Sequence, residues 1–192
     1  MWGVMEVLVN SGKATYIASS NFAGPDLVRA QWEADKRHFL GLVAEQHQYH
    51  LLSRLPELEV IPAARELGLG FVTYSPLAGG MLGENALKRL SGSRGETRHY
   101  SEAMIKTLTD FADFCRELGE KQSDVAMAWI LKNPVVTSPL IGPRTPEHLD
   151  NILHALDVKL DDSAMKRLDE IFPGPGGEAV SYTHLRAHET LM

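Results

Sequence analysis

Four short segments of this chain have the pattern of strands that each run into a polar or glycine-bearing corner, and helical patterns separate them. The segments cover residues 16–21, 42–46, 71–77 and 137–142. Because strand and helix alternate, the pattern predicts an α/β fold with a parallel sheet. In such sheets, and above all in (β/α)₈ barrels, the groups that contact ligand lie at the carboxyl ends of the strands. The polar side chains expected at those ends are Ser20, Asn21, Gln46, Tyr74 and Arg144.

Size and charge limit the classes of protein that fit. The chain has 192 residues, whereas a complete eightfold barrel has about 250. Its net charge of −6 argues against a nucleic-acid partner, whose binding needs a basic surface. The sequence shows no apolar run of about 18 residues and no signal-peptide pattern, so we expect no membrane partner. The one cysteine, Cys115, excludes an internal disulfide and predicts a reducing, cytoplasmic location.

Helical patterns fill the segments between the strands. The residues expected to cap or end these helices are Gly12, Gly68, Ser123 or Asp124, Thr145, and Asp161 or Asp162. The helix after Thr145 is expected to carry an apolar stripe formed by Leu149, Ile152, Leu153 and Leu156. Residues 78–100 contain five glycines and little periodicity, which predicts a long functional loop.

Two positions could hold an anion. After the third strand, Pro76 fixes a turn, Gly79 and Gly80 allow close approach, and the amides of Leu77 and Ala78 are expected to lack regular partners. An ordinary strand-to-loop corner is the alternative. Arg144 precedes Thr145, the expected N-cap of a helix, where amide dipoles and a guanidinium would converge on an anion. A merely exposed arginine is the alternative there.

Other reactive side chains have simpler interpretations. His47 and His50 are three residues apart, but no cysteine or carboxylate completes a set of ligands with them, so no metal is expected. Gln46 could pair with a planar carboxamide or cap backbone groups, and Tyr74 could stack on a flat ring or pack in the core. Cys115 is expected to be a buried packing residue.

Several of these segments, taken in order, resemble a known family. The matching stretches are Ser19-Ser20-Asn21-Phe22, Glu45-Gln46, the run from Ala63 to Gly70, Tyr74-Ser75-Pro76-Leu77-Ala78-Gly79-Gly80, and Ile141 to Glu147. Residues 1–179 are similar to the aldo-keto reductases, and most similar to the bacterial branch related to potassium-channel β subunits. That family folds as a TIM (β/α)₈ barrel, binds NADP(H) and transfers hydride to aldehydes and ketones.

The resemblance implies a role for each matching position. The four strands correspond to the fifth to eighth of the barrel, so the expected fold is a partial TIM barrel. Ser20, Asn21 and Gln46 match residues that hold the nicotinamide carboxamide, and Tyr74 matches the ring stacked on the nicotinamide. The pyrophosphate-side loop is matched by Ser75, Pro76, Leu77, Ala78 and Gly79. The region around the adenosine 2′-phosphate and adenine is matched by Gly142, Arg144, His148 and Asn151.

The chain also departs from the family. Histidine replaces a frequent glutamine at position 148, isoleucine replaces asparagine at 152, and asparagine replaces a loop lysine at 85; Arg94 or Arg98 could compensate for that lysine. The family's catalytic aspartate, tyrosine, lysine and histidine lie on the first four strands, which have no counterpart here. We therefore expect an inactive, cofactor-binding part of an NADP-dependent reductase of small carbonyl compounds.

Two alternatives stay open, and one end of the chain stands apart. A non-catalytic nicotinamide-nucleotide-binding module similar to a channel β subunit would share the same cofactor residues. A different phosphate-binding barrel, such as an aldolase or isomerase, would need a lysine or a carboxylate pair at the strand ends, and none is found. Residues 180–192 look like a translated sequencing adapter and are interpreted as a non-native tail following the domain at 1–179.

Overall fold

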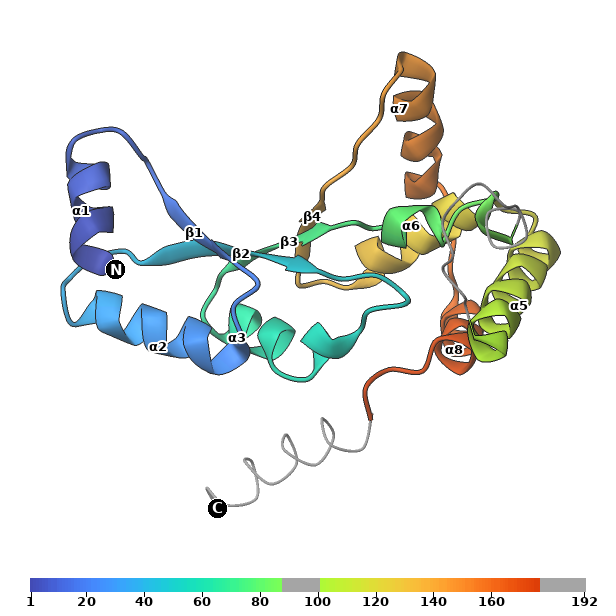
Figure 1. Cartoon of the computed structure of the whole chain (residues 1–192), viewed down its shortest axis with the longest axis horizontal. Coiled ribbons are helices and arrows are strands. Elements are labelled where there is room, and N and C mark those ends of the chain that lie inside the picture. Colours follow the sequence, from blue (N-terminus) through green and yellow to red (C-terminus); the bar gives the residue numbers. More distant parts are fainter. Residues whose placement is uncertain (88–100, 177–192) are drawn as a thin grey trace.

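The centre of the molecule is a four-stranded parallel sheet with the order β1-β2-β3-β4. The computed structural model describes residues 1–87 and 101–176. The strands are β1 (Ile17–Ser20), β2 (Leu42–Gln48), β3 (Gly70–Tyr74) and β4 (Val136–Pro139). This sheet confirms the predicted α/β class and is consistent with part of a barrel (Figure 1). Its correspondence with the fifth to eighth barrel strands stays a prediction.

Two strand ends differ from the sequence prediction. β2 continues to Gln48, whose partner is Tyr74, so Gln46 lies two residues inside the strand and not at its end. The neighbouring β3 supplies ladder partners up to that point, with His47 paired to Thr73 and Gln48 to Tyr74. β4 ends at Pro139, before the predicted Gly142. One more backbone bond, from the amide of Leu140 to the carbonyl of Thr73 at 2.7 Å, extends the ladder beyond it.

Helices surround the sheet. They are α1 (Trp2–Asn10), α2 (Gly24–Asp35), α3 (Val60–Glu66), α5 (Glu102–Leu118), α6 (Gln122–Lys132), α7 (Pro146–Leu153) and α8 (Asp162–Ile171). Short 3₁₀ turns are η1 (Leu55–Glu57), η2 (Ala78–Gly80) and η3 (His154–Leu156). Figure 1 shows α2 and α3 together on one side of the sheet, α5 and α8 side by side, and α7 projecting away. Residues 88–100, with Arg94, Arg98 and most of the predicted long loop, lie outside the described residues.

Side-chain caps confirm two of the predicted helix starts and correct a third. Thr145 accepts a hydrogen bond from the amide of His148, and Asp161 accepts one from the amide of Ala164. The start of α6 was predicted wrongly, because the helix begins at Gln122 with Lys121 as its N-cap. Ser123 therefore lies inside the first turn, where its hydroxyl donates to Oε1 of Glu84 at 2.7 Å and does not cap the helix.

The core lies between the sheet and its covering helices. Its fully buried members include Leu27, Phe71, Leu82, Leu108, Phe111, Ile130 and Leu168. Tyr49 packs against Trp129 with ring centroids 5.1 Å apart, and Phe111 packs against Phe172 at 5.2 Å. Burial of such large apolar surfaces is the main favourable term in folding.

The apolar stripe predicted for the helix after Thr145 is only partly buried, because Ile152 packs against the core but the other three members are exposed. Leu149 is 40% exposed, Leu153 49% and Leu156 63%. Figure 1 gives the reason, because α7 stands away from the sheet and from the other helices. The periodicity correctly predicted the helix, but the described residues supply no layer that covers this face.

Arg54 joins two distant parts of the chain. Its guanidinium donates to both carboxylate oxygens of Glu57, at 2.8 and 3.0 Å. It also donates to Asp169 at 2.6 Å and to the carbonyl of Phe172 at 2.7 Å.

The described part of the chain holds no helix that has both the length and the apolar character needed to cross a membrane.

Candidate functional site

Three predicted site residues meet at the carboxyl edge of the sheet. The hydroxyl of Tyr74 donates to Oδ1 of Asn21 at 2.9 Å, and Nδ2 of Asn21 donates to Oγ of Ser20 at 3.1 Å. The backbone amide of Asn21 donates to the carbonyl of Gln46 at 3.0 Å. Parallel strands bring their carboxyl ends to one edge, which is why residues from β1, β2 and β3 converge there. The edge therefore presents an amide, a phenol ring and a hydroxyl within one hydrogen-bonded group.

A buried carboxylate behind this edge holds the turn that carries Asn21. Glu45 is fully buried, and its Oε1 accepts from the amide of Phe22 at 3.0 Å. Its Oε2 accepts from Oγ of Ser19 at 2.5 Å, and Nδ1 of His47 lies 3.0 Å from Oε1. Asn21 itself has a φ of 58°, a left-handed conformation that asparagine tolerates better than most residues. Glu45 is thus hydrogen-bonded to residues on both sides of Asn21 and holds its left-handed backbone in place.

Sequence reasoning quoted Glu45 only as part of a matching stretch. A fully buried glutamate is rare unless it is paired or hydrogen-bonded. The available signal was a carboxylate placed directly after the apolar run from Leu42 to Ala44 in a predicted strand.

The loop after β3 concentrates unusual backbone. Ser75 has a φ of 54° and Ala78 a φ of 50°, and Gly79 and Gly80 follow with 65° and 92°. Left-handed conformations at residues other than glycine cost free energy and cluster at ligand-binding loops. One prediction about this loop is wrong: the amide of Ala78 is not free, because it donates to the carbonyl of Ser75 at 2.8 Å in a tight turn.

A pocket of about 410 Å³ lies beyond this loop. Four predicted residues line it, namely Leu77, Gly142, His148 and Asn151. They come from the loop after β3 and from the segment between β4 and the end of α7, so two distant predicted groups do share one cavity. Arg144 is exposed and is not among the residues that line the pocket, so the structure does not bring it together with the others.

The same pocket has polar walls that sequence reasoning missed. Glu84, Lys121, Ser123 and Asp124 line its other side. Burial alone would raise the pKa of Glu84, but hydrogen bonds from the Ser123 side chain and backbone outweigh it and lower that pKa. Nζ of Lys121 lies 3.4 Å from Oδ1 of Asn151 and donates to it. Only the folded arrangement shows this wall, because the start of α6 is remote in sequence from the other lining residues.

The remaining reactive side chains serve the fold. The hydroxyl of Tyr49 donates to Glu57 at 2.9 Å and accepts from Asn133 at 3.2 Å, and burial raises its pKa. Burial lowers the pKa of His50 to about 4 and raises that of Cys115 to about 12. Cys115 is 1% exposed, which confirms that it is a packing residue.

Known proteins are similar to this chain in sequence. A sequence model of the Aldo/keto reductase family matches residues 1–172. The chain is 55% identical over 179 residues to an uncharacterized oxidoreductase, YrpG, of Bacillus subtilis (strain 168), a match that covers 93% of the chain and 55% of YrpG. It is 30% identical over 176 residues to versiconal hemiacetal acetate reductase of Aspergillus parasiticus, with 85% of the chain and 50% of that enzyme covered.

A third relative has a different description. The chain is 29% identical over 178 residues to a candidate voltage-gated potassium channel subunit beta of Schizosaccharomyces pombe, with 85% of the chain and 52% of that protein covered. Because the family model matches most of its length, the chain belongs to the aldo/keto reductase family of oxidoreductases. The family resemblance drawn from the sequence motifs is therefore confirmed. The chain spans about half the length of these relatives. Residues 180–192 lie outside the described residues, and their interpretation as a tail stays a prediction.

Proposed function

We propose that this chain is the cofactor-binding part of an NADP(H)-dependent oxidoreductase that reduces aldehydes or ketones. The observation that supports it most is the hydrogen-bonded group of Ser20, Asn21 and Tyr74 at the carboxyl edge of the sheet. Family members generally use nicotinamide cofactors, and a bound dinucleotide would supply the hydride. The polar edge offers donors and acceptors of the kind that a carboxamide needs.

The rest of the proposed binding site follows the loops. Ser75, Pro76, Leu77, Ala78 and Gly79 form the pyrophosphate side, where strained backbone and glycine allow close approach. Gly142, His148 and Asn151 line the pocket proposed for the adenosine, whose volume of about 410 Å³ falls within the range of small-molecule sites. Arg144 does not line the pocket, but it is exposed and directly follows the lining residue Pro143 in the sequence. Its guanidinium would supply the positive charge for a 2′-phosphate.

We further propose that the 192-residue chain binds the cofactor but does not catalyse carbonyl reduction on its own. Carbonyl reduction needs a proton donor placed where charge develops on the oxygen. Among the described tyrosines, Tyr49 is buried and engaged with Glu57, Tyr74 donates to Asn21, and Tyr16 stands before β1, at the amino edge of the sheet. The proposal includes a small carbonyl substrate, a cytoplasmic location, and no nucleic-acid or membrane partner.

Two measurements on the purified chain test this proposal. Titration with NADPH, followed by the change in its fluorescence, is expected to show saturable binding that Asn21→Ala weakens and Tyr16→Phe leaves unchanged. A panel of aldehydes is expected to give no oxidation of the cofactor. Absence of saturable binding would contradict the cofactor proposal, and rapid turnover would contradict the inactivity proposal.

A non-catalytic nicotinamide-binding module is the second candidate. The S. pombe relative described as a candidate channel subunit beta favours it. The two candidates differ in what the chain would do when joined to the part of a relative that it does not match. A fusion of this chain to the part of YrpG that it does not match is expected to reduce aldehydes if the chain acts as part of a reductase. Tight NADPH binding with no turnover would favour the module.

A further inference from the structure

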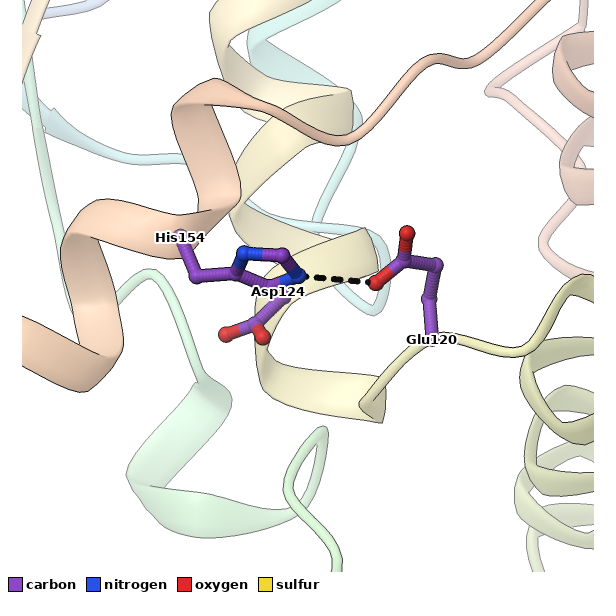
Figure 2. Close-up of side chains that lie close together, drawn as sticks. All are labelled: Glu120, Asp124 and His154. Carbon is purple, nitrogen blue, oxygen red and sulfur yellow. Dashed lines mark hydrogen bonds and ion pairs between the residues drawn. The ribbon is translucent and has the colours of Figure 1, made fainter.

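Three side chains that can bind metal converge near the proposed adenosine pocket. Glu120 lies between α5 and α6, Asp124 in the first turn of α6, and His154 at the start of η3. Each offers one ligand atom, and these atoms all lie within 4.8 Å of one another. Figure 2 shows the carboxylate of Asp124 beside the imidazole of His154, with Glu120 approaching from the α5–α6 turn. Three separate elements thus supply the cluster.

Asp124 has a buried oxygen that lacks a partner. The residue is 2% exposed, and its Oδ2 has no hydrogen-bond partner within the described structure. Its Oδ1 accepts only a long bond of 3.3 Å from Oγ of Ser123. An unpaired carboxylate oxygen removed from water is costly, and such orphaned atoms are few in native proteins. A cation at the cluster would satisfy it.

The charges that face Asp124 favour a cation. Glu84 lies on the pocket side and Glu120 on the other, so three carboxylates gather around the start of α6. The positive partners are Lys121, whose ammonium is engaged with Asn151, and His154. The Nε2 of His154 lies 3.1 Å from Oε2 of Glu120, an exposed contact that by itself adds little stability.

We propose that Glu120, Asp124 and His154 form a binding site for a divalent transition metal, with Zn²⁺ as the best match. One imidazole nitrogen and two carboxylate oxygens are ligands that Zn²⁺ accepts, with water in the fourth position. Ligand atoms about 2.0–2.2 Å from a shared zinc lie closer to one another than the 4.8 Å within which these three atoms fall, so small side-chain rotations would complete the site. Such a metal would fasten η3 to α6.

This proposal departs from the expectation that the chain binds no metal. That expectation considered only His47 and His50, which are neighbours in sequence. Glu120 and His154 are 34 residues apart, so no sequence spacing pointed to them. The metal site shares a wall with the pocket proposed for the adenosine, because Asp124 lines that pocket. Its test measures the binding of Zn²⁺ alone, so its outcome does not depend on the binding of a dinucleotide.

Calorimetry on the full chain, after treatment with a chelator and desalting, tests the site. We expect one equivalent of Zn²⁺ to bind, with Mg²⁺ at least tenfold weaker. Co²⁺ is expected to give visible absorption bands that Zn²⁺ abolishes. Asp124→Asn and His154→Gln should each weaken Zn²⁺ binding by about tenfold or more, whereas the exposed controls Asp157→Asn and His38→Gln should leave it unchanged.

The same series can overturn the proposal. No stoichiometric Zn²⁺ binding, or equal affinity in the wild-type chain and the Asp124 and His154 variants, would show that the cluster is only an ion pair beside a buried acid. If Asp124→Asn does not fold, Glu120→Gln provides the second variant, because Glu120 is at the edge of the cluster and not in the core. Unchanged Zn²⁺ affinity in that variant would also refute the site.

Discussion

The hydroxyl of Tyr74 donates a 2.9 Å hydrogen bond to Oδ1 of Asn21, although 53 residues separate them. β2 lies between β1, which Asn21 follows, and β3, which ends at Tyr74, so the two side chains meet across β2 at the carboxyl edge. Because Nδ2 of Asn21 donates to Ser20, both ends of the amide are fixed. Pre-orientation of this kind reduces the entropy that a ligand must lose on binding.

Replacing Tyr74 by phenylalanine tests the bond without removing the ring. We expect Tyr74→Phe to weaken NADPH binding by about three- to tenfold, the equivalent of a lost hydrogen bond of about 0.5–1.5 kcal/mol. Tyr74→Ala should weaken it further, because the stacking surface is lost as well. Fluorescence titration measures both affinities. If Tyr74→Phe binds NADPH as tightly as the wild-type chain, the hydroxyl has no role in recognition. If Tyr74→Ala binds it as tightly as Tyr74→Phe, the ring has no role.

Replacing Glu45 by glutamine tests the buried network behind Asn21. The amide of the variant offers a donor where Ser19 and Phe22 both need an acceptor. We expect the free energy of unfolding to fall by about 1–3 kcal/mol, measured by urea denaturation. Glu33→Gln, which alters an exposed pair with Lys36, should change it by less than about 0.5 kcal/mol. Equal effects of the two variants would contradict the assigned role.

His50 predicts a pH dependence of stability. Its pKa in the folded chain is lowered from 6.5 to about 4 by burial, so the unfolded chain binds the proton more readily between these values. Stability is therefore expected to fall as the pH decreases from about 6.5 towards 4. His50→Gln removes one titrating group, so the free energy of unfolding should depend less steeply on pH in this range. Urea melts at several pH values compare the two chains, and parallel curves would show that His50 does not contribute.

The same substitution at two glycines should have opposite effects. Gly68 follows α3 with a φ of 65°, and a Cβ there meets nothing within 4 Å, so Gly68→Ala carries only conformational strain. We expect a loss of about 1 kcal/mol. Gly3 lies in the first turn of α1, where alanine should add about 0.5 kcal/mol. Thermal melts measure both changes, and a shift of the same sign in the two variants would contradict this account.

The sheet and most of its helices followed from local patterns. Strand-helix alternation placed Asn21 and Tyr74 at one edge, and Thr145 and Asp161 signalled helix starts that the structure confirms. These features depend on a few neighbouring residues. Sequence reasoning failed where tertiary contacts decide the outcome. Ser123 has the chemistry of an N-cap, but a bond to Glu84 uses its hydroxyl inside the helix.

Long-range pairing also explains what was missed in the candidate site. Glu45 differs from a surface glutamate only by its partners Ser19 and Phe22, which lie more than 20 residues away. Leu153 belongs to a stripe that any amphipathic helix would show, yet it is 49% exposed in the described chain. Whether an apolar face is buried depends on the layer above it, and periodicity does not specify that layer.

The Arg54 guanidinium sets a condition on how this protein is made. Its bond to the carbonyl of Phe172 joins residues 118 positions apart. During translation, the half-buried arginine emerges well before α8. The part of the sheet that is made first therefore carries this cation without its partners Asp169 and Phe172. Contacts of such high sequence separation slow folding and prolong the lifetime of aggregation-prone intermediates. A nascent chain of this kind would gain from a chaperone until residue 172 leaves the ribosome.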